Sequence, residues 1–221
     1  MARRREQAFV PWIYDLFRRI LGLALRVRCR FRSHDYAYIP AEGGVIIASN
    51  HASFLDPPVL GVAVPHRPVR FMARDTLFDH SFLAWFYYRF GVVPLSREKG
   101  DVGAIKTAIQ LLREGHCVAL FPEGTRTPDG HLQPAKGGVG FLIHKANVPV
   151  VPAYIRGSYE AWPKGAKKMK SAPVSVHFGP PISPEALCLT DDRGKPDYMG
   201  IGAMVMARIA ELRDAAANPG S

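Results

Sequence analysis

The chain has 221 residues, of which 48% are hydrophobic and 22% charged, so it can bury the core of one domain and is not intrinsically disordered. Its formal net charge of +10 predicts attraction to polyanions or to anionic lipid, without choosing between nucleic acid and membrane. The three cysteines, Cys29, Cys117 and Cys188, are odd in number and far apart, which argues against a disulfide framework and against a zinc site. No His, Cys and carboxylate cluster has ligand spacing, so we expect no metal.

The first predicted element is an amphipathic helix over Phe9–Leu25, preceded by arginines. Asp15, Arg18 and Arg19 make it too charged for a transmembrane helix, and no secretory signal is recognised. An aromatic-rich apolar face with flanking arginines suits the headgroup region of an anionic bilayer, and a core helix with a solvated basic face is the alternative. We therefore assign residues 1–35 as a membrane-associating segment, with an apolar face made of Phe9, Trp12, Ile13, Leu16, Ile20 and Leu23.

Short apolar runs then alternate with helical patterns. The predicted strands are Val45–Ser49, Val69–Ala73, Gly91–Leu95, Cys117–Phe121, Val148–Ile155 and Val174–Phe178. The predicted helices are Pro57–Val64, Phe78–Phe90, Val102–Glu114, Gly137–Ala146 and Tyr198–Asp214. This alternation predicts an α/β domain over residues 36–215, with a mixed or mostly parallel sheet flanked by helices. The Lys- and Gly-rich region Gly157–Ser171 is predicted to be a loop, and residues 216–221 a flexible tail.

Polar clusters follow three of the predicted strands. They are Asn50–Asp56, Ser96–Asp101 and Pro122–Arg126. In open α/β sheets, ligands bind beyond the carboxyl ends of the strands. We therefore expect all three clusters to open onto one edge of the sheet.

A histidine and an aspartate, His51 and Asp56, lie five positions apart after the first strand. A carboxylate can hold one imidazole nitrogen while the other nitrogen takes a proton. On a regular helix this spacing is about 500° of rotation, about 140° from alignment, so a turn must separate the two residues. Pro57 and Pro58 suit a helix that begins just after Asp56. Asp56 as an ordinary helix N-cap is the alternative interpretation.

The segment Pro122–Arg126 places a carboxylate, a glycine, a hydroxyl and a guanidinium directly after an apolar strand. Gly124 lets a ligand approach the backbone, Thr125 can donate a hydrogen bond, and Arg126 can clamp a phosphate with two. Arg74 and Arg97 also follow strands and would add positive charge at the same edge. The alternative is an ordinary strand-to-loop turn with solvated arginines.

Taken together, the motifs resemble those of the glycerophospholipid acyltransferases, in particular the bacterial 1-acyl-glycerol-3-phosphate acyltransferases. Four blocks carry the resemblance, in the family's order and spacing. They are Asn50-His51-x-Ser53-x-x-Asp56, Gly91-Val92-Val93-Pro94-Leu95-Ser96-Arg97, Phe121-Pro122-Glu123-Gly124-Thr125-Arg126 and Val148-Pro149-Val150-Val151-Pro152-Ala153. The four blocks span about half of the chain.

The resemblance implies an enzyme that moves a fatty-acyl group from acyl-CoA or acyl-carrier protein to a lysophospholipid, forming phosphatidic acid in phospholipid biosynthesis. His51 would be the general base and Asp56 would orient it. Arg97 and the block Glu123, Gly124, Thr125 and Arg126 would hold the glycerophosphate headgroup. Arg74 stands where such enzymes often carry a lysine. No cofactor beyond the acyl donor is implied, and the enzyme would lie on the cytoplasmic face of a membrane, peripheral or monotopic.

Two other functions are considered. The acceptor could be another lysolipid, such as an ornithine lipid precursor, in which case the assignment of phosphate-binding arginines fails. The chain could also be a non-catalytic lipid-binding protein, against which the intact His51–Asp56 pair argues. A nucleic-acid partner rests on charge alone and has no recognised motif.

Overall fold

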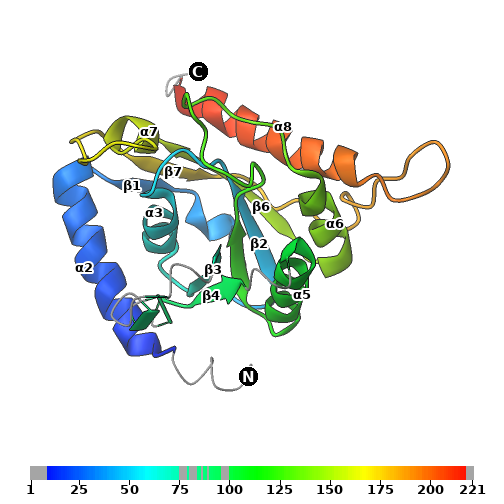
Figure 1. The fold of residues 1–221 in the computed structure, drawn as a ribbon, viewed down its shortest axis with the longest axis horizontal. Helices are drawn as coiled ribbons and strands as arrows, with labels where there is room; N and C mark the ends of the chain where they lie inside the picture. The colour runs from blue at the N-terminus through cyan, green and yellow to red at the C-terminus, as the bar shows by residue number, and fades with distance from the viewer. Residues whose placement is uncertain are drawn as a thin grey trace.

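The fold is taken from a computed structural model, which describes residues 9–74, 79, 84–85, 87–88, 90–95 and 100–217. Helices and strands alternate along most of the chain (Figure 1). In order, the elements are α2 (Pro11–Cys29), β1 (Arg32–His34), the 3-10 helix η1 (Tyr36–Tyr38), β2 (Val45–Ser49), α3 (Asp56–Ala63), β3 (Val69–Arg74), β4 (Val92–Leu95), α5 (Gly100–Arg113), β5 (Cys117–Leu120), α6 (Gly137–Ala146), β6 (Val150–Arg156), α7 (Ser158–Ala161), β7 (Ser175–Phe178) and α8 (Tyr198–Ala217).

The strands form one seven-stranded sheet in the order β1-β7-β6-β2-β5-β3-β4. All neighbouring pairs are parallel except β6 and β7, which run antiparallel. The predicted α/β class with a mostly parallel sheet is therefore confirmed. Strand β1 was not predicted because its three residues, Arg-Ser-His, contain no apolar run. It is held at the sheet edge by parallel pairing with β7, in which Arg32 lies opposite Ser175.

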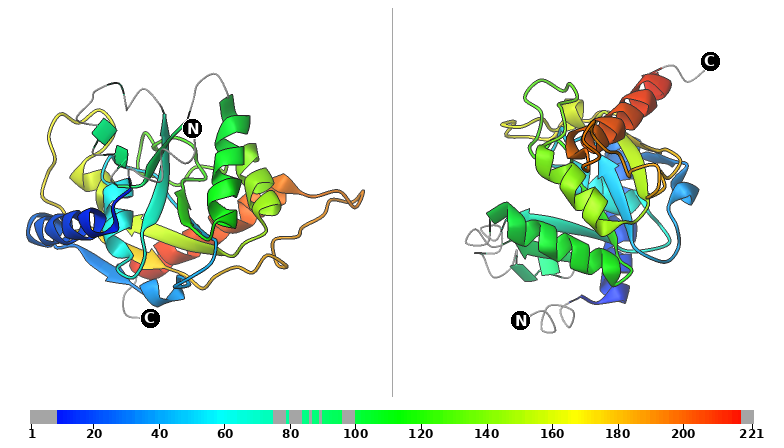
Figure 2. Two further views of the ribbon diagram at one scale, coloured as in Figure 1. Left: turned by 90° about the horizontal axis from the view of Figure 1, so that it is seen from below. Right: turned by 90° about the vertical axis from the view of Figure 1, so that its right-hand side faces the viewer.

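Two apolar layers cover the sheet, one on each face. Strand β2 lies at the centre, and all five of its residues are buried. Val45 and Ile47 contact the layer that includes α2 and α3, whereas Ile46 and Ala48 contact the layer formed with α5, α6 and α8. Figure 2 shows the sheet between these helices from two further directions. A strand buried on both faces explains the unbroken apolar run in its sequence.

Helix α2 contributes to the core through one face and exposes another. Leu25 and Cys29 belong to the buried layer, and the Tyr14 hydroxyl links α2 to α3 by donating to the Gly61 carbonyl at 3.4 Å. The same hydroxyl accepts the Val69 N–H at 3.3 Å. The helix ends at Cys29, and the residue that caps it, Arg30, has a left-handed φ of 47°. Within the ranges that the structure describes, no helix has the length and apolarity needed to cross a membrane.

Two regions differ from the sequence-based prediction, and a third cannot be compared with it in full. The segment predicted as a loop, Gly157–Ser171, begins with the short helix α7. Helix α8 continues to Ala217, past the predicted end at Asp214, and the carbonyl of Ala216 accepts a hydrogen bond from Arg156. The predicted helix Phe78–Phe90 falls largely outside the described residues, with helical backbone at 84–85 and 87–88.

The close packing of α6 on α8 gives a test of the fold. Gly140 is buried in α6, and a Cβ added there would overlap the backbone carbonyl of Tyr198. Because backbone cannot move aside as a flexible side chain can, Gly140→Ala should lower the free energy of unfolding by about 1–3 kcal/mol. Gly138→Ala in the same helix is the control, since its Cβ would meet Ile105 at an ordinary 3.9 Å. Equal stability of the two variants in urea unfolding would contradict this packing.

Candidate active site

The site lies at the carboxyl ends of two adjacent central strands. Strands β2 and β5 pair in parallel, with Ala48 beside Leu120. The clusters Asn50–Asp56 and Pro122–Arg126 therefore leave the sheet at the same edge (Figure 1), as predicted. Most of the third cluster, Ser96–Asp101, lies outside the described residues.

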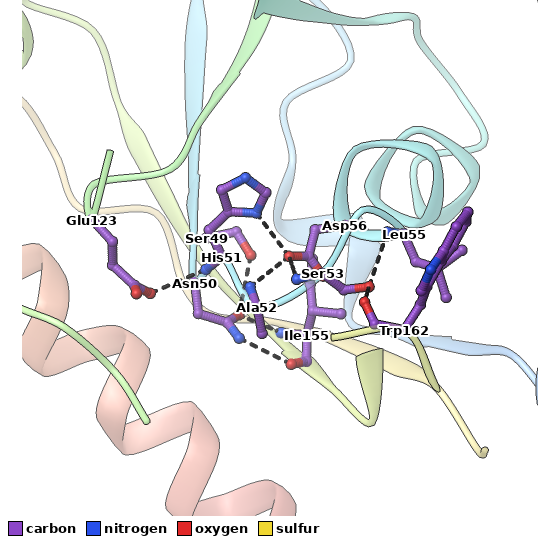
Figure 3. Close-up of polar contacts among 10 residues, drawn as sticks. All are labelled: Ser49, Asn50, His51, Ala52, Ser53, Leu55, Asp56, Glu123, Ile155 and Trp162. Atoms are coloured by element: carbon purple, nitrogen blue, oxygen red, sulfur yellow. Dashed lines mark hydrogen bonds and ion pairs between the residues drawn. The ribbon is translucent and has the colours of Figure 1, made fainter. Parts of the chain in front are cut away.

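The His51 ring and the Asp56 carboxylate are in direct contact, with 2.8 Å between Nδ1 and Oδ2 (Figure 3). The same Oδ2 accepts the backbone N–H groups of Ala52 and Ser53, at 2.6 and 2.7 Å. These bonds close residues 51–56 into a tight turn, and α3 begins at Asp56. The N-cap interpretation is wrong, because the carboxylate bonds backwards along the chain and Leu55 occupies the N-cap position.

The hydrogen bonds around Asp56 also assign the proton on His51. Asp56 is fully buried, and two backbone N–H donors together with the N-terminus of α3 stabilise a negative charge on it. Because an ionised carboxylate only accepts, Nδ1 of His51 carries the proton. The lone pair on Nε2 is then available to take a proton from a substrate. The His51 side chain remains 18% exposed, so a ligand can reach it.

Glu123 and its neighbours hold His51 from the opposite side. Oε1 of Glu123 accepts the His51 backbone N–H at 3.0 Å, as drawn in Figure 3. The His51 carbonyl in turn accepts the N–H of Thr127 at 2.8 Å. The imidazole stacks on the Phe121 ring, with 4.1 Å between the centroids and 17° between the planes. The segment after β5 therefore fixes the backbone and the ring plane of His51.

The carboxyl of Glu123 is itself in an unusual environment. It is 2% exposed, and burial raises its pKa to about 7, helped by the negative charge of Asp56. The backbone N–H groups of His51 and Gln133 act in the opposite direction and lower the pKa. Within the described part of the chain, Oε2 is buried and has no hydrogen-bond partner. Glu123 therefore faces His51, and its contact with a headgroup stays a prediction.

The Arg126 guanidinium lies on an aromatic platform beside this turn. Its Cζ is 3.4 Å from the centre of the Phe54 ring. Phe54 in turn packs against Trp162, with 5.7 Å between the ring centroids. Its Nη1 is buried and finds no partner among the described residues. Gly124, with φ of 67°, and Thr125 are exposed next to it. A cationic donor with an unused N–H at the site is suited to bind an anion.

The other two predicted arginines are not placed at the site. Arg74 is the last residue of β3, so its backbone ends at the same sheet edge, but its side chain lies outside the described part of the structure. Arg97 also lies outside the described residues. Their roles stay predictions.

Sequence reasoning did not assign roles to several residues that build the turn. The Asn50 side chain accepts the N–H of Ile155 at 2.7 Å and donates to its carbonyl at 3.0 Å, which joins the end of β2 to β6. The Ser53 hydroxyl donates to the Trp162 carbonyl at 2.7 Å and accepts the Leu55 N–H at 3.1 Å. Asn and Ser directly after a buried strand are a signal for such a side-chain-stabilised turn. The platform under Arg126 had no such signal.

The raised pKa of Glu123 predicts a pH-dependent stability. The folded state binds this proton more tightly than the unfolded state, so the contribution is present at pH 4.5 and below and is lost as pH rises through about 7. Glu123→Gln keeps an acceptor for His51 but does not titrate. Its free energy of unfolding relative to the native chain should therefore improve by up to about 3 kcal/mol between about pH 5 and pH 8. A difference that does not vary with pH would refute this, and Glu42→Gln, at an exposed position, is the control.

Comparison with known proteins agrees with this geometry. The acyltransferase family model matches residues 30–156. A 1-acyl-sn-glycerol-3-phosphate acyltransferase from Bacillus subtilis is 29% identical over 170 residues, which cover 77% of this chain and 82% of the relative. The human 1-acyl-sn-glycerol-3-phosphate acyltransferase beta is 29% identical over 190 residues, or 84% of this chain and 66% of the relative.

A solved structure of such an acyltransferase is also similar to this chain. The crystal structure of the 1-acyl-sn-glycerophosphate acyltransferase PlsC from Thermotoga maritima matches with a TM-score of 0.72 and 25% sequence identity. The match covers 90% of this chain and 78% of that one. The family model spans more than half of the sequence and includes His51, Asp56 and Glu123, so the chain belongs to the acyltransferase family.

Proposed function

We propose that this chain transfers a fatty-acyl group from acyl-CoA or acyl-carrier protein to the free hydroxyl of 1-acyl-glycerol-3-phosphate, forming phosphatidic acid. The observation that carries the proposal is the 2.8 Å contact between His51 and Asp56, close to an arginine whose buried N–H is unused among the described residues. The names of the relatives from Bacillus subtilis and human supply the acceptor.

The chemistry requires one base and no covalent enzyme intermediate. Nε2 of His51 removes the proton from the acceptor hydroxyl, and the hydroxyl oxygen attacks the thioester carbonyl carbon. Asp56 stabilises the imidazolium that forms, through the hydrogen bond at Nδ1. The tetrahedral intermediate then collapses, the carbon–sulfur bond breaks, and the leaving thiolate takes the proton from His51. The products are the ester and a free thiol.

The acceptor phosphate would bind at the segment after β5. Arg126 supplies a charge-assisted donor, Thr125 a hydroxyl, and Gly124 a position without a side chain. Arg74 and Arg97 remain candidates for the same phosphate. Because Nη1 of Arg126 is already desolvated, a phosphate oxygen that bonds to it would satisfy a buried donor.

A membrane surface is the proposed working place of the enzyme, on its cytoplasmic face. Helix α2 presents a continuous stripe of exposed apolar side chains at helical spacing, opposite the face that packs on α3. Such a stripe suits the boundary between headgroups and acyl chains, which fits the proposed role of residues 1–35. The stripe consists of Trp12, Leu16, Ile20, Leu23 and Val27.

Removal of the base tests the mechanism. His51→Ala should lower the rate of thiol release from the acyl donor by about 10²–10⁴-fold, the usual contribution of a positioned base. His66→Ala is the control, because His66 precedes β3 and so lies at the amino-terminal edge of the sheet. If His51→Ala keeps near-native activity, His51 is not the base. If the native chain releases no thiol with any donor and lysolipid, the non-catalytic alternative stands.

Substitution at Arg126 tests phosphate recognition. Arg126→Ala should raise the KM for 1-acyl-glycerol-3-phosphate by about 10- to 100-fold, the worth of a charged hydrogen bond, and leave the KM for the donor unchanged. Phe54→Leu should cause a smaller rise of about 2- to 5-fold, because it removes only the cation–π support. A phosphate-free lysolipid measures binding without the phosphate. Preference of the native chain for that acceptor would favour the alternative substrate and exclude this role for Arg126.

A further inference from the structure

A group of unpaired cations lies where the end of α2 meets the loop between α7 and β7. The group has seven side chains, and all of them are exposed. None of them takes part in an ion pair with another described residue. Their charge is therefore not neutralised within the described part of the protein. We refer to this group as the basic rim, and it consists of Arg26, Arg28, Arg30, Lys164, Lys167, Lys168 and Lys170.

The loop that carries the four lysines is fixed against α2. The Arg28 side chain donates to the Met169 carbonyl at 3.3 Å, and the Ser171 hydroxyl donates to the Arg28 carbonyl at 2.8 Å. Met169 also packs against the buried layer, and the Lys170 N–H bonds to the Ala161 carbonyl at 2.8 Å. Figure 1 shows this loop beside the carboxyl-terminal end of α2. The lysines are thus held on one surface together with the arginines of α2.

The basic rim is continuous with the apolar stripe of α2. Val27, the last residue of the stripe, is 78% exposed and lies between Arg26 and Arg28. An apolar stripe that ends in a cluster of cations has the composition of a contact with an anionic bilayer, where acyl chains take the stripe and acidic headgroups take the cations. A folded acidic protein would match the charges but would leave the stripe without a partner.

We propose that the loop between α7 and β7, with its lysines Lys164, Lys167, Lys168 and Lys170, is a second membrane contact, distinct from the apolar stripe. This contact makes membrane binding by the protein selective for anionic phospholipid headgroups. The proposal rests on the proposed function, in that the enzyme works on lipid at a membrane surface. The stripe supplies affinity for any bilayer, and the basic rim adds affinity only where the headgroups are acidic.

The loop is also connected to the active site. It follows Trp162, whose carbonyl binds the Ser53 hydroxyl, and Pro163 forms an isolated β-bridge with Ser53. Ser53 belongs to the turn that holds His51 against Asp56. Contact of the loop with acidic headgroups would therefore bring the catalytic edge to the layer that contains the acceptor phosphate.

The test compares two variants with the same change in charge. Lys164→Gln/Lys167→Gln/Lys168→Gln/Lys170→Gln removes the lysines of the loop. The control, Lys106→Gln/Lys145→Gln/Arg193→Gln/Lys195→Gln, removes four exposed cations on α5, on α6 and in the segment before α8. Co-sedimentation is measured with vesicles of phosphatidylcholine alone and of phosphatidylcholine with about one third phosphatidylglycerol.

The loop variant should bind the anionic vesicles about 10- to 100-fold more weakly than the native chain and bind the neutral vesicles equally well. The control variant should lose much less, and high salt should remove the difference between the two variants. Leu16→Ser/Ile20→Ser/Leu23→Ser, in the stripe, should weaken binding to both kinds of vesicle. Should the quadruple loop variant unfold, Lys167→Gln/Lys168→Gln gives the same comparison with a smaller effect.

Native-like binding of a folded loop variant to anionic vesicles would overturn the proposal. So would a defect confined to reactions with acyl-carrier protein as donor, since that would identify an acidic protein as the partner. Thiol release in neutral detergent micelles should be the same for the loop variant and the native chain. If neither is active in micelles, the proposed acyl transfer fails, whereas the vesicle measurements still decide the lipid contact.

Discussion

The arrangement of the site depends on one buried carboxylate. Asp56 has no exposed surface, and a carboxylate in that position must be compensated by donors. The chain meets this requirement locally at one oxygen, since Oδ2 accepts the N–H groups of Ala52 and Ser53 and the Nδ1–H of His51, whereas Oδ1 is buried and has no hydrogen-bond partner among the described residues. Residues 51–55 cannot satisfy these bonds as a regular helix, so the helix is delayed until Asp56. The turn that brings His51 to Asp56 is thus the same turn that supplies backbone N–H groups to the buried carboxylate.

A second carboxyl, that of Glu123, lies 72 residues beyond His51 in the sequence and is bound to the same histidine in a different way. Parallel pairing of β2 with β5 brings Glu123 under the His51 backbone N–H, while burial and the charge of Asp56 raise its pKa to about 7. Asp56 contacts the ring and Glu123 contacts the backbone. The two carboxyls therefore hold different parts of His51, one the ring and the other the main chain.

Much of the fold follows from patterns visible in the sequence. The central strand Val45–Ser49 and the helix Gly137–Ala146 were predicted with their observed bounds. The strand is a short, nearly continuous apolar run, and the helix stops at Asn147, whose backbone is left-handed. The edge strand β1 was missed, since its pairing with β7 comes from the tertiary fold and not from an apolar pattern. In the site, the motif residues were identified but their contacts were not. Spacing cannot reveal that Phe54 lies under Arg126, because that contact depends on where two separate loops meet.

Helix α2 has features that each of its two sequence-based interpretations expects. Tyr14, Leu25 and Cys29 bury one face in the core, as the core-helix alternative expects. Trp12, 68% exposed, and Leu16 lie on the apolar stripe that the membrane interpretation required. Phe9 was assigned to the membrane face but instead packs near Tyr14, with 5.8 Å between the ring centroids. An amphipathic pattern shows that a helix has an apolar face. When a helix is apolar on two sides, only the fold shows which side packs in the core and which side is exposed.

The distribution of charge separates recruitment from catalysis. Acidic side chains elsewhere neutralise arginines locally, as Asp15 does for Arg18, whereas the cations of the basic rim have no ion-pair partner in the described structure. Next to His51 lie two carboxyls instead, those of Asp56 and Glu123, and the raised pKa of Glu123 leaves it partly protonated near pH 7. Anions should therefore be attracted mainly to the rim, and at the candidate site the buried N–H of Arg126, which has no hydrogen-bond partner among the described residues, offers one point of contact. A phosphate-bearing acceptor would satisfy that donor, so under the proposed function the rim would collect anionic lipid and Arg126 would hold the acceptor.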